Sequence, residues 1–444
     1  MFNKILIANR GEIAVRIIRA CREMNIETVA VYSETDREAL HVMLADEAVC
    51  IGPAKAKDSY LNMQNIISAT VLTGARAIHP GFGFLSENSS FARMCEDCNI
   101  AFIGPTADTI ELMGNKSRAR ETMMKAGVPV VPGSEGEIVC IKDAHELAEI
   151  IGYPIMIKAS SGGGGKGMRA VYDSKDLENA IQSAKNEAKA AFGDDKVYLE
   201  KLIVNPKHIE FQILADKFGN ILHLGERDCS LQRRNQKVLE ETPSAIMTSE
   251  LRSRMGSAAI KAAKASGYVN AGTIEFLLDN KGNYYFMEMN TRVQVEHPIT
   301  EMVTGIDIIK EQIRIACGEK LPYKQKDIVF AGHAIECRIN AEDPKRNFMP
   351  CPGLVENVLF PGGFGVRIDS ALYPGYMVPS CYDSMIAKVI AYGKDRNEAI
   401  QRMKRALSEF VIDGIETNID YQYELLEKEE VLSGRYHTGF IEGK

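Results

Sequence analysis

The chain of 444 residues is 45% hydrophobic and 25% charged, which is ordinary for a globular protein of about three domains. Its net charge of −7 gives no electrostatic case for a nucleic-acid partner, and no apolar run approaches the about 20 residues that cross a membrane. The cysteines are scattered without a disulfide framework, so we expect a reduced, cytoplasmic protein.

Residues 1–113 alternate short apolar strands with helices. Gly11 opens an amphipathic helix, and strands are predicted at 5–8, 28–32, 47–51, 77–79 and 101–103. This alternation favours a parallel, doubly wound α/β sheet with helices on both faces. The turn at 9–12 lacks the full G-x-G-x-x-G spacing and therefore does not indicate a dinucleotide site. The glycine-rich loop 79–84 either lines a site or is a plain tight turn.

Cys95 and Cys98 form a C-x-x-C pair in this region. A zinc site would need a second pair at a similar spacing, and the sequence has none. We expect the two thiols on a helix, buried or half-buried, without a metal or redox role.

Residues 114–204 carry a predicted helix at 116–125, a linker at about 114–132 and a glycine-rich segment at 153–172. That segment, YPIMIKASSGGGGKGMRAVY, has one strand that ends at Lys158, then four glycines and a second strand. Glycines leave backbone N–H groups free to approach phosphate. The Walker A pattern fails because Lys166 precedes another glycine. We predict a flexible flap over a triphosphate, with a mobile surface hairpin as the alternative.

Three further segments follow. Residues 197–203 are predicted as a linking strand where a base can dock, and His208 and Glu210 follow in a strand-like alternation. The polar run 226–237, ERDCSLQRRNQK, is by default a solvated loop. Residues 248–267 have the caps of a helix.

A β-hairpin is predicted from residues 272–278 and 283–289. If Lys281 and Gly282 sit at its tip, Glu275 lies directly opposite Glu288. Like charges in a direct cross-strand pair are destabilising. A divalent cation between them removes the repulsion, and carboxylate oxygens suit Mg²⁺ or Mn²⁺. The alternative is an exposed strand with unpaired carboxylates.

The same strand is predicted to run on as an extended segment through residue 300. Strand alternation then puts five polar side chains on one face, surrounded by apolar neighbours: Glu288, Asn290, Arg292, Gln294 and Glu296. We interpret this row as the floor of a site.

The remaining residues are predicted to hold a helix after Thr304, a strand at 333–340, an antiparallel sheet within 351–385 and an amphipathic helix at 397–410. The predicted domain division is 1–113, 114–204 and 205–444, the last with a C-terminal part from about 330.

Four motifs together carry a specific resemblance: HPGFGFLSEN, KASSGGGGKGMR, CSLQRRNQK and EMNTRVQVEHPITE. With them, the chain resembles biotin carboxylase, the ATP-grasp component of acetyl-CoA carboxylase and related biotin-dependent carboxylases, from KILIANRGEIAVRIIRA to its C-terminus. The resemblance implies an ATP-grasp fold with an N-terminal Rossmann-like domain, a glycine-loop lid domain and a C-terminal mixed or antiparallel sheet domain.

The resemblance also implies roles for individual residues. Nucleotide contacts would come from Lys116, Lys158, Gly164, Gly165, Glu200, Lys201, Leu202, Ile203, His208, Gln232, Asn235, Glu275 and Glu288. Magnesium or manganese would be held by Glu275, Glu288 and Asn290. Bicarbonate would be bound by Lys237, Arg292, Gln294 and Val295. Glu296 would be the general base, and Arg338 would bind biotin at its ureido oxygen; with Lys237 and Arg292 these form the catalytic set. Asn235 stands where many relatives have His.

The implied reaction is ATP-dependent carboxylation of biotin on a biotin carboxyl carrier protein, with bicarbonate as the carbon source and carboxyphosphate as the intermediate. The sequence lacks a Met-Lys-Met biotinyl segment, so we expect a separate carrier, carboxyltransferase subunits as partners, and a homodimer. Acetyl-CoA is the expected final acceptor, which would feed fatty acid synthesis; pyruvate and propionyl-CoA stay open. A different ATP-grasp ligase and a non-enzymatic ATP-binding scaffold stay open as well.

Overall fold

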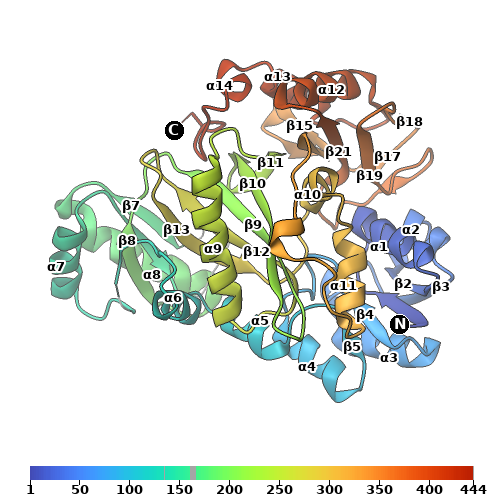
Figure 1. Ribbon diagram of the computed structural model, residues 1–444, viewed down its shortest axis with the longest axis horizontal. Coiled ribbons are helices and arrows are strands. Elements are labelled where there is room, and N and C mark those ends of the chain that lie inside the picture. Colours follow the sequence, from blue (N-terminus) through green and yellow to red (C-terminus); the bar gives the residue numbers. More distant parts are fainter. Residues whose placement is uncertain (135, 161–166, 444) are drawn as a thin grey trace.

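A computed structural model describes residues 1–134, 136–160 and 167–443. An N-terminal α/β region and a small lid region lie at opposite ends of the molecule, with a large sheet between them (Figure 1). The C-terminal helices, drawn in red, lie above that sheet in the same view (Figure 1). The predicted combination of a Rossmann-like sheet, a lid and a mixed C-terminal part is therefore confirmed.

The N-terminal region is a five-stranded parallel sheet of order β3-β2-β1-β4-β5. Its strands are β1 (Lys4–Ile7), β2 (Glu27–Ser33), β3 (Glu47–Gly52), β4 (Ala77–His79) and β5 (Ala101–Phe102). Its helices are α1 (Gly11–Glu23), η1 (Glu34–Asp36), α2 (Leu40–Leu44), η2 (Ala56–Asp58), α3 (Met63–Thr73), α4 (Ser89–Asp97) and α5 (Ala107–Gly114). All five predicted strands are present; β1, β2 and β4 are largely buried between helices, whereas β3 and β5, at the edges of the sheet, are partly exposed. Cys95 is buried on α4 as expected, but Cys98 is exposed just beyond the helix.

The lid is a three-stranded antiparallel sheet, β7-β6-β8, with its own hydrophobic core. Its elements are α7 (Ile141–Ile151), β6 (Ile155–Ala159), β7 (Met168–Val171), η3 (Ser174–Asp176), α8 (Leu177–Phe192) and β8 (Val197–Lys201). The preceding helix, α6 (Lys116–Lys125), packs through Ala119 and Met123 into the core of the central sheet instead. The predicted strands on either side of the glycine run are confirmed. Gly164, Gly165 and Lys166 lie outside the described residues.

The central sheet has eight strands in the order β13-β12-β9-β10-β11-β14-β21-β19, and all its pairings are antiparallel. The strands are β9 (Lys207–Ala215), β10 (Ile221–Arg233), β11 (Gln236–Thr242), β12 (Asn270–Leu278), β13 (Tyr284–Asn290), β14 (His333–Asn340), β19 (Val366–Ser370) and β21 (Met385–Gly393). The associated helices are α9 (Ser249–Ala265), α10 (His297–Thr304), α11 (Ile308–Ala316) and η4 (Gln325–Asp327). Because the sheet is continuous, residues far apart in sequence share one surface.

The C-terminal part completes the fold with short antiparallel pairs instead of the one sheet predicted for 351–385. These strands are β15 (Glu342–Asp343), β16 (Met349–Pro350), β17 (Gly353–Leu354), β18 (Asn357–Leu359), β20 (Met377–Val378) and β22 (Val411–Asp413). The helices are η5 (Pro344–Arg346), α12 (Arg396–Glu409), α13 (Ile419–Leu425) and α14 (Glu429–Leu432).

The polar run 226–237 is not a solvated loop. It forms the end of β10 and the start of β11, joined by a tight turn at Arg234 and Asn235, both of which have positive φ. Arg227 is fully buried, where its guanidinium donates to Glu210 Oε1 at 2.6 Å and to Gln212 Oε1 at 2.8 Å. Long-range partners of this kind allow charged residues to be buried inside a sheet.

For the predicted hairpin, the pairing of the two glutamates is confirmed, but the predicted tip is wrong. Glu275 is the cross-strand partner of Glu288, as expected. The connection, however, is the longer loop 279–283, in which Asp279 Oδ1 accepts the N–H groups of Lys281 and Asn283. A register shift between Glu275 and Phe276 offsets the longer loop and restores the predicted pairing of the two glutamates.

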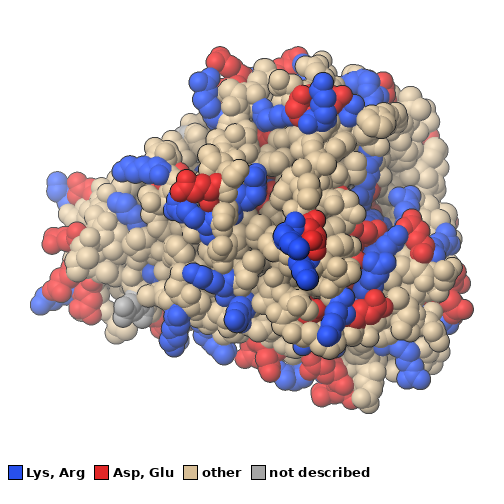
Figure 2. Space-filling model, viewed as in Figure 1, with Lys and Arg blue, Asp and Glu red and all other residues tan. Residues whose placement is uncertain are grey.

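The outer surface mixes charges of both signs on the face shown in Figure 2. Among the described residues, none of the helices combines the length and the apolar character that would let it cross a bilayer.

The central sheet contains a second pair of opposed carboxyl groups. Glu240 on β11 and Glu336 on β14 are direct cross-strand partners, and both are fully buried. Both carboxyl oxygens of Glu336 and Oε2 of Glu240 have no hydrogen-bond partner among the described residues. Burial raises the pKa of Glu240 to about 7 and that of Glu336 well above its usual value. The pair therefore retains a proton near neutral pH.

We predict that Glu336→Gln becomes more stabilising, relative to the wild type, as pH rises from about 5 to about 8. A carboxyl whose pKa is raised in the folded state loses stability as pH rises from its unfolded pKa toward its folded pKa, whereas Gln has no such loss. Melting temperatures measured across this range test it, with the surface variant Glu427→Gln as control. A difference in Tm that stays flat or shrinks with pH would contradict the raised pKa of Glu336.

Candidate active site

A cavity of about 1010 Å³ lies where the N-terminal region, the lid and the central sheet meet. Its lining includes, of the predicted site residues, Lys116, Lys158, Glu200, Lys201, Leu202, Ile203, His208, Gln232, Asn235, Lys237, Glu275, Glu288, Asn290, Arg292, Gln294, Val295 and Arg338. Phe82 and Gly83 of the glycine-rich loop also line it, so that loop faces the site. Glu296 is fully buried directly beside the cavity, in contact with two of the lining residues.

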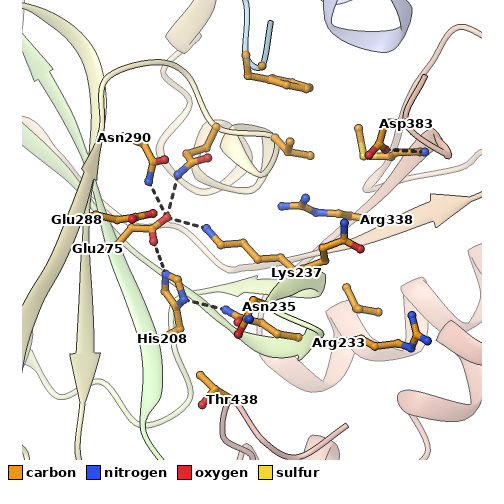
Figure 3. A pocket seen from close by; sticks show the side chains of 18 of the residues that line it. His208, Arg233, Asn235, Lys237, Glu275, Glu288, Asn290, Arg338, Asp383 and Thr438 are labelled. Atoms are coloured by element: carbon orange, nitrogen blue, oxygen red, sulfur yellow. Dashed lines mark hydrogen bonds and ion pairs between the residues drawn. The ribbon is translucent and has the colours of Figure 1, made fainter. Parts of the chain in front are cut away.

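The opposed acids Glu275 and Glu288 lie on the wall formed by β12 and β13 (Figure 3). Glu275 is buried, and its Oε1 accepts hydrogen bonds from Asn290 Nδ2 at 2.8 Å and Gln294 Nε2 at 3.1 Å. Its Oε2 lies 2.9 Å from His208 Nε2. Burial raises the pKa of Glu275, but Lys237 and His208 outweigh it and hold that pKa well below its usual value. Glu275 is therefore ionised.

Glu288 differs from its partner in being half-exposed, with a side-chain exposure of 39%. Among the described residues, its ion pair is to Lys116 Nζ at 3.8 Å. Partial burial and the neighbouring Glu275 both raise its pKa. A carboxylate that repels its neighbour and faces an open cavity is one that a hard divalent cation would stabilise. The two acids, with the amide of Asn290 beside them, fit the oxygen ligands of Mg²⁺ or Mn²⁺.

Lys237 is the hub of the buried charges. Its Nζ donates to Glu210 Oε2 and to Glu296 Oε1, each at 2.6 Å, and to Glu275 Oε1 at 3.0 Å. Burial lowers the pKa of Lys237, but these three carboxylates outweigh it and raise the pKa well above its usual value. Lys237 is thus a permanent cation at the floor of the cavity. Glu210 was not predicted as a site residue, although its place on the same face of β9 as His208 was the available signal.

Glu296 and Arg338 form an ion pair next to this hub. Arg338 Nη2 donates to Glu296 Oε2 at 2.9 Å, while Arg338 Nε donates to Glu240 Oε1 at 2.6 Å. Burial raises the pKa of Glu296, but Lys237, Arg338 and Arg227 outweigh it and hold the pKa well below the usual range. The extended segment predicted through residue 300 is wrong at its end: β13 ends at Asn290, α10 begins at His297, and Glu296 is the N-cap residue of α10.

Arg292 lines the cavity beside Asn290 and Gln294. Its Nη1 donates to Gln294 Oε1 at 2.7 Å and its Nη2 to Asn290 Oδ1 at 3.1 Å, so these three side chains of the predicted row do lie together. Its Nε donates to Glu87 Oε2 at 2.8 Å. Glu87, from the N-terminal region, was not predicted as a site residue, since no local pattern links it to Arg292.

The lid side of the cavity carries further cationic groups. Lys158 forms an ion pair with Glu200, and Lys201 Nζ donates to the carbonyls of Gly152 at 2.9 Å and Tyr153 at 3.0 Å. Residues 200–203, at the end of the lid strand β8, line the cavity. This arrangement suits a nucleotide whose phosphates point toward Lys116, Lys158 and the acid pair.

His208 lies between Gln232 and Glu275 in the wall of the cavity. Gln232 Nε2 lies 2.8 Å from His208 Nδ1, and Nε2 of the same ring faces Glu275. Burial lowers the pKa of His208, but the Glu275 carboxylate outweighs it, so the pKa is raised. Asn235, in the left-handed turn between β10 and β11, lines the cavity nearby.

Three family models match the chain in succession. Residues 1–110 match the biotin carboxylase N-terminal domain, residues 115–324 match the carbamoyl-phosphate synthase L chain ATP-binding domain, and residues 336–443 match the biotin carboxylase C-terminal domain.

Similar proteins cover the whole chain. Biotin carboxylase 1 of Bacillus subtilis is 62% identical over 443 residues, which span 100% of this chain and 98% of that protein. A pyruvate carboxylase subunit of Methanothermobacter thermautotrophicus is 54% identical over 442 residues, 100% of this chain and 90% of that protein. Among solved structures, the biotin carboxylase domain dimer of Hydrogenobacter thermophilus 2-oxoglutarate carboxylase, in complex with MgADP, ADP and bicarbonate, has a TM-score of 0.94 and 51% identity, covering 100% of this chain and 98% of that chain. The chain belongs to the biotin carboxylase family.

Proposed function

We propose that this ATP-dependent ligase carboxylates biotin on a carrier protein, with bicarbonate, ATP and Mg²⁺ or Mn²⁺ as the other participants. The observation that carries the proposal is the cavity that brings together an opposed acid pair, the cations Lys237 and Arg292, the buried carboxylate Glu296 and Arg338. Joining bicarbonate to a phosphoryl group requires cations and a base that activate the bicarbonate, next to a divalent cation that binds the phosphates.

ATP would bind between the lid and the central sheet, with its base at 200–203 and its phosphates near Lys116 and Lys158. Contacts from Gly164 and Gly165 stay a prediction. Glu275, Glu288 and Asn290 would hold the divalent cation, which when bound neutralises charge on the transferred phosphoryl group. Lid closure would keep water from carboxyphosphate, which is unstable in water.

Bicarbonate would bind to Lys237, Arg292, Gln294 and the backbone of Val295, within reach of Glu296. With its pKa held low by Lys237 and Arg338, Glu296 is a weak base before bicarbonate binds. When the bicarbonate anion draws Lys237 toward itself, Glu296 loses part of that stabilisation and becomes more basic. Substrate binding would thus activate the general base that takes the bicarbonate proton.

Carboxyphosphate would then decompose to CO₂ and phosphate, and the phosphate would deprotonate biotin at N1′. Arg338 is placed to stabilise the resulting enolate oxygen, because its guanidinium is fixed by Glu240 and Glu296. Its pKa is raised: burial lowers it, but Glu240 and Glu296 outweigh burial. Arg338 therefore remains cationic throughout.

We further propose a biotin carboxyl carrier protein and carboxyltransferase subunits as partners, assembly as a homodimer, and a cytoplasmic location. The dimer of the Hydrogenobacter relative supports the third of these, and the ten cysteines, all within the described residues and all free, support the last. Acetyl-CoA is the proposed final acceptor; the similarity to a pyruvate carboxylase subunit favours pyruvate as the second candidate. The domain division at 113 and 204 stays a prediction.

We expect Glu296→Gln to lower bicarbonate- and biotin-dependent ATP hydrolysis by about 10²–10⁴-fold, because the general base is lost while its volume is kept. Phosphate release at saturating ATP and bicarbonate measures this. Glu409→Gln, on the exposed face of α12, is the matched control and should turn over ATP as the wild type does. Wild-type rates in Glu296→Gln would rule out the assignment of the base.

Arg338→Met should lose the acceleration of ATP turnover by free biotin, by about 10²–10³-fold, because the cation that stabilises the enolate is removed. The rate is compared with and without biotin at fixed bicarbonate, so that loss of the biotin response is separated from loss of the first step. A variant that still responds to biotin in full would show that Arg338 does not face the ureido oxygen. If biotin fails to accelerate even the wild type, a different ATP-grasp ligase is favoured.

A further inference from the structure

Lys388 is a buried lysine that does not line the cavity, but it contacts the backbone of Val295, one of the residues proposed to bind bicarbonate. Lys388, on β21, is completely buried, and its Nζ donates to the carbonyl oxygen of Val295 at 2.8 Å. Val295 lines the cavity, and Glu296 is the next residue. A fully desolvated ammonium that donates to a backbone carbonyl is a strong, directional contact.

Lys388 is the direct cross-strand partner of Arg338. Arg338 holds the side chain of Glu296, and Lys388 holds the carbonyl that precedes it. Two neighbouring cations on β14 and β21 thus fix both the side chain and the backbone of one turn. Like charges side by side in a sheet are unfavourable unless each has its own acceptor, and here each has one.

Acids from two other elements balance the charge of Lys388. Its Nζ lies 3.1 Å from Glu12 Oε1 on α1 and 3.9 Å from Asp369 Oδ2 on β19. Asp369 is itself held by both Arg367 Nε and Nη2 at 2.8 Å. Burial lowers the pKa of Lys388, but Glu12, Glu336 and Asp369 outweigh it, so the lysine is charged.

The geometry of a peptide bond gives the contact a consequence for the site. The C=O of Val295 and the N–H of Glu296 belong to one planar trans peptide and point in opposite directions. Because Lys388 anchors the carbonyl inside the protein, the Glu296 N–H is turned away from the sheet. Loss of the anchor would free this peptide to rotate and would shift the Val295 backbone and the Glu296 side chain together.

We propose that Lys388 is a positioning residue for the bicarbonate site. Its hydrogen bond to the carbonyl of Val295 fixes the Val295–Glu296 peptide, and Glu12 of the N-terminal region is its counter-ion. This inference rests on the proposed function, since it assigns the substrate whose binding depends on the anchor. It also means that the anion site is built in part by the docking of α1 against β21.

The test is steady-state ATP hydrolysis by the full chain, in which KM is measured separately for bicarbonate and for ATP in the presence of free biotin. Lys388→Met should raise the KM for bicarbonate by about tenfold or more, while the KM for ATP changes less than about threefold. The control is Lys404→Met, which removes a partly buried lysine paired with Glu427 on the same C-terminal part, outside the cavity lining, and should leave both KM values as in the wild type.

A second variant separates positioning from charge balance. Glu12→Gln/Lys388→Met removes both members of the ion pair, so the buried acid no longer lacks a partner, but the bond to Val295 is still absent. We expect the double variant to regain thermal stability and to keep the raised KM for bicarbonate. If Lys388→Met does not fold, the double variant carries the test alone.

Recovery of the bicarbonate KM in the double variant, or an equal rise of both KM values, would overturn the proposal, because either result means that Lys388 only balances charge or supports the fold. A wild-type enzyme that lacks bicarbonate-dependent turnover would instead refute the proposed function, so the two failures are distinguishable.

Discussion

The direct opposition of Glu275 and Glu288 across β12 and β13 is the constraint on which the rest of the site depends. Two carboxylates at neighbouring strand positions repel each other, and the protein relieves Glu275 far more than Glu288. Glu275 is surrounded by Lys237, His208, Asn290 and Gln294, whereas Glu288 faces the cavity with, among the described residues, a longer ion pair to Lys116. In the proposed function, the incompletely compensated charge of Glu288 is the reason why this wall would bind a cation, and through the cation a nucleotide.

The buried cations of the central sheet are also compensated by acids from other parts of the chain. Lys237, Arg338 and Lys388 come from three different strands, and each is completed by acids supplied from elsewhere in the chain. The continuous eight-stranded sheet makes this possible, because it carries residues from β9 to β21 on one surface. Such a network is costly to leave incomplete, since each unpartnered charge would be buried in a low dielectric. The charges are thus ordered before substrates arrive, as electrostatic preorganisation requires.

Local sequence patterns were sufficient to predict much of the fold and of the candidate site. Helix caps, apolar runs and the turn residues at 280–283 predicted the parallel sheet, the strands flanking the glycine run and the Glu275–Glu288 hairpin. The tip of that hairpin was wrong, because a bulge leaves no mark in residue types. Glu296 was expected in an extended segment through residue 300, although Pro298, in the first turn of α10, was a signal for a helix start. What no local rule could supply were the long-range pairings: Arg227 with Glu210, Arg292 with Glu87, and Lys388 with Val295.

The most direct measurement of the central claim is Mn²⁺ binding in the presence of ADP, followed by electron paramagnetic resonance of the free ion, in the wild type, Glu288→Gln and the surface control Glu427→Gln. If the opposed acids hold the cation, Glu288→Gln should weaken Mn²⁺ binding by at least about tenfold, while the control binds as the wild type does. Equal affinity in all three proteins would contradict the account, because the wall formed by β12 and β13 would then not be where the metal binds.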